Sequence, residues 1–104
     1  MGALGMNSGI QDAGNLAEKL GRVWRGEADA SLLDRYDRQR RTVAHEIIQA
    51  MSTANFKRVT ERDPAVRQQN RDEMRRICED PERHRDDMLQ TSMIASVRRA
   101  ATIE

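Results

Sequence analysis

Three glycines near the start of the chain, Gly2, Gly5 and Gly9, stand where a loop would lead into an amphipathic segment that includes Ile10. A helix that begins there leaves its first backbone N–H groups without intrahelical partners, beside the positive end of the helix dipole. Such an end binds anionic or electron-rich ligands through main-chain donors. Glycines with this spacing also occur at ordinary helix starts, so composition alone leaves both a ligand site and a structural turn open.

The other residues able to do chemistry give no catalytic or metal constellation. Asp12 falls in the first turns of the expected helix, where a carboxylate stabilises the dipole, so a structural role is favoured over that of a base. His45 and His84 lie far apart, with no Glu or Cys at ligand spacing, so no metal site is expected. Cys78 has no partner base and is expected to be a small buried hydrophobe.

An arginine cluster at Arg38, Arg40 and Arg41 raises the possibility of a phosphate site. Asp34 and Asp37 lie within one helical turn of it, and such guanidinium groups are usually paired and solvated. A solvated, ion-paired helix face is therefore the favoured interpretation.

Two stretches carry a family resemblance. Gly2 to Leu16, GALGMNSGIQDAGNL, resembles the last flavin-contacting motif of the FAD-dependent aromatic hydroxylases, the para-hydroxybenzoate hydroxylase and ubiquinone-biosynthesis monooxygenase type. Leu32 to Ala44, LLDRYDRQRRTVA, is similar to that family's Leu-Leu-x-x-Tyr-x-x-Glu-Arg-Arg-Pro-Val-Ala, and the spacing between the two stretches also fits. Gln39 replaces the usual Glu and Thr42 the usual Pro, and neither position is an expected flavin contact.

The resemblance implies a site, a cofactor and an activity. Main-chain groups would contact the isoalloxazine of FAD, NAD(P)H would be the reductant, and an aromatic small molecule would be the substrate. The cofactor-binding residues that it implies are Gly2, Ala3, Leu4, Gly5, Met6 and Asn7. The family's Gly-x-Gly-x-x-Gly motif for the ADP moiety is not in this sequence. The chain is therefore expected to be a C-terminal fragment of an α/β, Rossmann-type parent, inactive and unable to hold FAD tightly by itself.

A first helix is expected to begin between Gly5 and Ser8 and to close at Gly26. Its apolar residues recur at three- and four-residue steps and form one stripe: Ile10, Ala13, Leu16, Ala17, Leu20, Val23 and Trp24.

A long second helix is predicted after a short polar link. Ser31 is its expected N-cap, and helical periodicity continues to about Val59. Two helices with so short a connection pack antiparallel. We expect Leu20 and Trp24 to lie against Leu33, Tyr36 and their neighbours.

Two shorter helices are expected to follow, because Asp63-Pro64 and Asp80-Pro81 each place a capping side chain before a proline at the first helical position. The third helix would run to about Cys78, and the fourth would continue past Val97. The last residues, Ala100 to Glu104, are expected either to fray or to pack only against a remainder of the parent protein.

Composition limits the classes of function. The chain has 104 residues, 34% of them charged and 3% aromatic, so little bulky side-chain volume is available for an independent core. The net charge of +1 comes from interleaved basic and acidic residues, which disfavours a nucleic-acid binder. The sequence holds one cysteine and no apolar run long enough to span a membrane, which suits a cytoplasmic location.

The sequence thus predicts an all-α chain, a helical hairpin plus two shorter helices. Residues 1–60 would form the flavin-proximal loop and hairpin, and residues 61–104 a C-terminal helical segment with a possible homo-oligomer contact. The alternative is a stand-alone helical bundle for protein–protein interaction or dimerisation, and a weaker one is an arginine-rich helical binder of nucleic acid.

Overall fold

The computed structural model describes residues 4–104, and within them every regular element is helical. Six α-helices and one π-helix follow each other along the chain, and residues 4–104 contain no strand. The prediction of an all-α chain is therefore confirmed. The bounds of the elements are α1 Leu4–Trp24, α2 Leu32–Val43, η1 Ala44–Ile48, α3 Gln49–Thr60, α4 Pro64–Glu79, α5 Pro81–Thr91 and α6 Ile94–Ala101.

The first helix ends as its sequence predicts. Gly26 has a φ of +73°, a left-handed conformation that glycine adopts without steric cost. Its N–H bonds the carbonyl of Val23 at 3.1 Å, and the N–H of Glu27 bonds that of Arg22 at 2.9 Å. This pair of bonds is the Schellman motif, which satisfies the last carbonyls of a helix. The start of α1 at Leu4 lies one residue before the expected range, within the usual variation of helix ends.

The long second helix is present, but it is not uniform. The helical backbone continues from Leu32 to Thr60 through the π-helix Ala44–Ile48, which periodicity did not predict. Ser31 is wrongly predicted as a capping side chain, because its backbone is already helical and its hydroxyl makes no cap bond. The carboxylate of Asp29 instead accepts the N–H of Ser31 at 2.6 Å, so the turn is organised two residues earlier.

Both Asp-Pro helix starts are confirmed. The carboxylate of Asp63 accepts the N–H of Ala65 at 2.9 Å, and that of Asp80 accepts the N–H groups of Glu82 and Arg83. The expected single helix after Asp80 is broken into α5 and α6, however. Met93 has a φ of +63° between them, and its side chain is buried. Burial of this side chain offsets the cost of a left-handed non-glycine residue.

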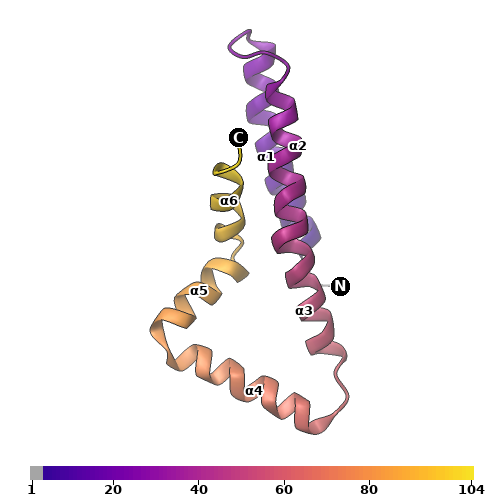
Figure 1. The fold of residues 1–104 in the computed structure, drawn as a ribbon, viewed down its shortest axis with the longest axis vertical. Helices are drawn as coiled ribbons and strands as arrows, with labels where there is room; N and C mark the ends of the chain where they lie inside the picture. Colours follow the sequence, from indigo (N-terminus) through magenta and orange to yellow (C-terminus); the bar gives the residue numbers. More distant parts are fainter. Residues whose placement is uncertain (1–3) are drawn as a thin grey trace.

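The elements form an open frame rather than a closed bundle. Figure 1 shows α1 and α2 side by side, α6 along α2, and α4 and α5 spanning the far end. The radius of gyration is 17.4 Å, against about 13 Å for a compact domain of this length. The accessible surface is 7580 Å², against about 6000 Å² for a compact protein of this mass. Few side chains are therefore fully enclosed, Val43 and Ser96 being the largest.

Helix α1 turns its polar face toward α2 and leaves its apolar stripe outside. Trp24 is 88% exposed and Ile10 64%, while about half of Leu20 is exposed. The predicted packing of Trp24 against α2 is therefore wrong. Two buried polar residues of α2, Gln39 and Arg40, explain the choice of face, because buried polar groups need hydrogen-bond partners that only the other side of α1 offers.

Candidate functional site

The predicted cofactor-binding residues divide between described and undescribed parts of the chain. Gly2 and Ala3 lie outside the described residues, whereas Leu4, Gly5, Met6 and Asn7 form the first turn of α1. Leu4 is buried, and the other three are exposed. The N–H groups at the start of a helix have no partner within it, so this turn presents main-chain donors at the positive end of a 21-residue helix.

Two features make this turn accessible to an electron-rich ligand. The first turn of α1 contains no acidic residue that would repel such a ligand. A Cβ added at Gly5 or at Gly9 would meet no atom of the described residues within 4 Å, so the backbone at both glycines is open on that side. No side chain of the described residues covers the main chain at these two glycines on that side.

The first half of α1 is held in place by contacts from two other helices. Arg40 of α2 donates through Nε to Oδ1 of Asp12 at 2.5 Å, and Arg40 is 7% exposed. The hydroxyl of Ser96 on α6 lies 3.1 Å from Oε1 of Gln11, and Ser96 is fully buried. Asp12 thus partners a buried cation of α2. The expected role at the helix dipole is not the one observed, because the first turn of α1 holds no acidic residue. The Ser96 contact spans 85 residues of sequence, and no local pattern could have predicted it.

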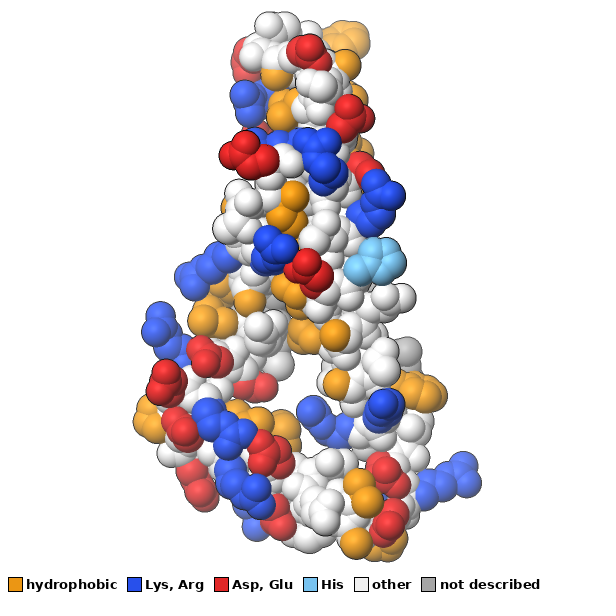
Figure 2. Space-filling view, viewed as in Figure 1, with side chains coloured by type: hydrophobic (Ala, Val, Ile, Leu, Met, Phe, Trp, Pro, Cys, Tyr) orange, Lys and Arg blue, Asp and Glu red, His pale blue; other side chains and the backbone are white. Residues whose placement is uncertain are grey.

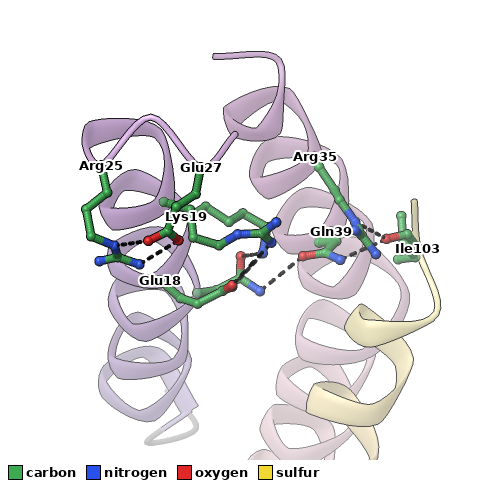
Figure 3. Close-up of polar contacts among 9 residues, drawn as sticks. Glu18, Lys19, Arg25, Glu27, Arg35, Gln39 and Ile103 are labelled. Carbon is green, nitrogen blue, oxygen red and sulfur yellow. Dashed lines mark hydrogen bonds and ion pairs between the residues drawn. The ribbon is translucent and has the colours of Figure 1, made fainter. Parts of the chain in front are cut away.

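A second polar chain joins α1, α2 and the C-terminal residues (Figure 3). Nζ of Lys19 donates to Oδ1 of Asn15 at 2.7 Å, and Nδ2 of Asn15 donates to Oε1 of Gln39 at 3.1 Å. Nε2 of Gln39 then donates to the carbonyl oxygen of Ile103 at 2.8 Å, and Arg35 donates to the same oxygen at 3.2 Å. Gln39 uses both ends of its amide, one to accept and one to donate. A glutamate, the usual family residue at this position, has no donor when ionised.

The C-terminal residues are anchored, so the prediction that they fray is wrong. Besides the bonds to Ile103, Nε of Arg38 donates to the carbonyl of Glu104 at 2.9 Å. The arginine cluster is correspondingly divided. Arg41 forms the expected exposed ion pair with Asp37, whereas Arg40 is buried against α1 and is not solvated as predicted.

A groove runs along this polar chain between α1, α2 and α6. Its volume is about 490 Å³ and it is open along one side. The groove lies further along α1 than the predicted cofactor-binding turn, because its α1 lining begins at Gln11. It therefore does not join Leu4 to Asn7 in one cavity.

Hydrogen bonds from arginine side chains lower the pKa values of two carboxyl groups. The guanidinium of Arg99 on α6 holds the pKa of Glu46 below its ordinary value, through bonds of 2.9 and 3.1 Å. Arg25 likewise lowers the pKa of Glu27 in the turn after α1. The pair of Arg99 and Glu46 connects α6 to the π-helix. The pair of Arg25 and Glu27 joins residues only two positions apart in the sequence.

The remaining sequence candidates are dispersed. Cys78 is exposed, so its predicted burial is wrong. His45 is exposed, with Nδ1 3.2 Å from Oε1 of Gln49. Within residues 4–104, no group of three or more His, Cys, Asp or Glu side chains is placed to hold a metal ion. Among the same residues, no helix is both long and apolar enough to cross a membrane.

Comparison with known proteins finds a family for the N-terminal half of the chain. Residues 1–51 match the family described as FAD binding domain. The match covers α1, α2, the whole π-helix and the start of α3, and includes the predicted cofactor-binding residues. No solved structure matches the chain significantly.

Curated relatives of the chain are monooxygenases and hydroxylases by name, one of them FAD-dependent. The chain is 43% identical over 67 residues to para-nitrophenol 4-monooxygenase of Pseudomonas sp., covering 64% of this chain and 17% of the relative. It is 60% identical over 43 residues to a putative polyketide hydroxylase of Streptomyces coelicolor, covering 41% and 7%. It is 50% identical over 48 residues to an FAD-dependent monooxygenase of Aspergillus terreus, covering 46% and 7%. The chain thus spans less than a fifth of the length of these relatives.

Proposed function

Because residues 1–51 match the family described as FAD binding domain, we propose that the chain is part of an FAD-dependent aromatic monooxygenase. The observation that carries this proposal is the open first turn of α1, Leu4 to Asn7, inside the matched segment. Its role would be to hold the pyrimidine edge of the flavin with main-chain N–H groups. NAD(P)H would be the reductant. An aromatic molecule would be the substrate, as it is in the names para-nitrophenol 4-monooxygenase and pentachlorophenol 4-monooxygenase.

The described residues fit the flavin at this position. The ring edge of FAD offers carbonyl and nitrogen acceptors, which require N–H donors and close approach to the backbone. The first turn of α1 supplies the donors, and the open side of Gly5 allows the approach. Bound FAD would accept hydride and activate oxygen, while the protein supplies binding, orientation and electrostatics.

The helix dipole gives this turn a second effect. Reduced flavin carries negative charge near the pyrimidine edge, and a helix N-terminus stabilises an anion by about 0.3 to 1 kcal/mol, or up to about 2 kcal/mol when partly buried. The buried Arg40 paired with Asp12 and the Gln11 contact to Ser96 hold α1 in position behind the turn. The turn would therefore favour the reduced cofactor as well as bind it.

The exposed stripe of α1 supports the view that this chain works within a larger protein. Met6, Ile10, Leu20 and Trp24 lie on one side of the helix and are 49 to 88% exposed. A monomer rarely leaves so continuous an apolar face in water. The rest of a flavin domain would cover it, and the isolated chain would neither hold FAD tightly nor catalyse the reaction. A second copy of the chain is the competing occupant, which would favour the alternative of a dimerising helical bundle.

A chimera tests the proposal. The aligned 67 residues of para-nitrophenol 4-monooxygenase are exchanged for those of this chain, and flavin retained after gel filtration is measured by absorbance. Leu4→Pro removes one N–H at a position where a helix tolerates proline, and Leu4→Ala is its matched control, since it removes the side chain and keeps the N–H. We expect Leu4→Pro to weaken FAD binding about tenfold relative to Leu4→Ala.

A second substitution tests close approach. Gly5→Ala places a methyl group in space that is open in this chain, so it should leave folding intact and still lower FAD retention in the chimera. Equal FAD binding by Leu4→Pro, Leu4→Ala and Gly5→Ala would refute the main-chain contact. Sedimentation of the isolated chain as a stable dimer with its stripe protected would favour the bundle instead.

A further inference from the structure

The angle between α3 and α4 contains a pocket lined by arginines that have no carboxylate partner among residues 4–104. Its volume is about 370 Å³. The lining consists of Arg58 from α3 with Arg67, Asn70, Arg71, Met74 and Arg75 from α4. Figure 2 shows basic side chains at the rim of the opening that α3, α4 and α5 enclose. This pocket lies outside residues 1–51 and is separate from the proposed flavin contact.

The spacing of these arginines opposes helix stability. Arg67, Arg71 and Arg75 follow each other at four-residue steps on one face of α4, where like charges repel. Of the other arginines on α4 and α5, Arg76 and Arg83 both pair with Glu73, while Arg85 has no ion pair among residues 4–104. The three arginines spaced along the pocket face repel one another, and a bound anion would remove that repulsion.

The chemistry of the lining favours a phosphate-bearing ligand. Guanidinium groups bind phosphate oxygens in a bidentate manner, and four of them exceed what a single carboxylate can neutralise. Asn70 is half-buried and adds an amide donor, while Met74 provides an apolar wall. A concave pocket suits a small soluble anion better than a long polymer. We propose that this pocket binds the diphosphate group of a soluble ligand.

Calorimetric titration of the whole 104-residue chain with inorganic pyrophosphate, and separately with adenosine diphosphate, tests the proposal. We expect saturable binding of one anion per chain that weakens with added salt. The double variant Arg71→Gln/Arg75→Gln should bind at least tenfold more weakly. Its matched control is Arg76→Gln/Arg83→Gln, which removes the same charge from the Glu73 pairs and should bind within twofold of the parent. Tighter binding of adenosine diphosphate would assign the diphosphate to a nucleotide, and tighter binding of pyrophosphate to a free anion.

Further measurements keep the test decisive. Removing repelling charges should raise the helicity of the Arg71→Gln/Arg75→Gln chain, which circular dichroism checks. Arg75→Lys keeps the charge without the planar guanidinium and should also weaken binding, so the proposal does not depend on one variant folding.

Equal losses of binding in the two double variants, or no saturable binding by the parent chain, would overturn the proposal. Stronger binding to anionic vesicles or to duplex DNA than to either diphosphate would also overturn it. No flavin is present, so failure here leaves the proposed monooxygenase function untouched.

Discussion

Nε of Arg40 lies 2.5 Å from Oδ1 of Asp12, and this ion pair joins α1 to α2. The side chain of Arg40 is 7% exposed and that of Asp12 40%, so water screens one end of the pair. Asp12→Ala leaves a buried cation without its partner. We expect a loss of about 1 to 3 kcal/mol in the free energy of unfolding, measured by urea denaturation.

The matched control for that prediction is the exposed pair of Arg41 and Asp37. Asp37→Ala should change stability by less than about 0.5 kcal/mol. A double-mutant cycle on Asp12 and Arg40 should show coupling that the Asp37 and Arg41 cycle lacks. Equal couplings in the two cycles would mean that the burial of Arg40 has no energetic effect.

Gln39→Glu should release the C-terminal residues. The change removes the N–H donor that bonds the carbonyl of Ile103 and costs about 1 kcal/mol. The amides of Thr102 and Ile103 should exchange faster with solvent, as hydrogen exchange followed by NMR would reveal. Gln69→Glu, on the exposed surface of α4, adds the same charge and should leave that exchange unchanged. If both variants keep the slow exchange of the parent, then Gln39 does not anchor these residues.

Gly26→Ala should destabilise the turn after α1. Its φ of +73° costs an alanine about 1 to 2 kcal/mol, although there is open space around it. Gly14→Ala is the control, since Gly14 lies within the helix with nothing within 4 Å of an added Cβ, and it should stabilise by about 0.5 to 1 kcal/mol. Thermal melts distinguish these opposite signs. A stabilising Gly26→Ala would exclude the left-handed turn.

The ion pair between Glu46 and Arg99 should make the attachment of α6 dependent on pH. Because the hydrogen bond from Arg99 lowers the pKa of Glu46 below 4.5, the pair stabilises the folded state above that pH. The stabilisation is lost as the pH falls through the lowered pKa. The melting temperature of Glu46→Gln should therefore lie below that of the parent near neutral pH and approach it in acid. Glu79→Gln, an exposed residue of α4, should show no such convergence.

The exposed stripe of α1 should contribute little to the stability of this chain. Ile10→Ser combined with Leu20→Ser is expected to change the free energy of unfolding by about 0.5 kcal/mol or less, whereas Val43→Ala, at a buried position, should cost about 2 kcal/mol. The same stripe variant placed in the chimera should lower FAD retention. A large loss in the isolated chain would show that the stripe is already packed there.

Local signals predicted the helices well. The Asp63 and Asp80 caps and the left-handed Gly26 depend on neighbouring residues, so their chemistry can be read within a few positions of sequence. The break at Met93 had no such signal, because a non-glycine residue adopts a positive φ there only through burial in the fold.

Periodicity located the apolar face of α1 but could not say what covers it. The face that meets α2 was decided by Gln39 and Arg40, whose partners come from 24 and 28 residues away, respectively. The anchoring of Ile103 depends on separations of 64 and 68 residues. The family resemblance identified the segment matched as an FAD binding domain, whereas the contact of Leu4 to Asn7 with flavin stays a prediction, as does the division at residue 60.

The π-helix from Ala44 to Ile48 interrupts the α-helical register between α2 and α3. A turn closed by i→i+5 bonds holds one residue more than an α-turn, and one residue corresponds to about 100° around the axis. The α-helical spacing counted from α2 therefore runs one residue out of step along α3, where Phe56 and Val59 are exposed although Val43 is buried. Deleting a single residue between positions 44 and 48 would let the segment close into an uninterrupted α-helix and leave the C-terminal arm in place, whereas deleting one residue from α3 would turn that arm by about 100° around the helix axis.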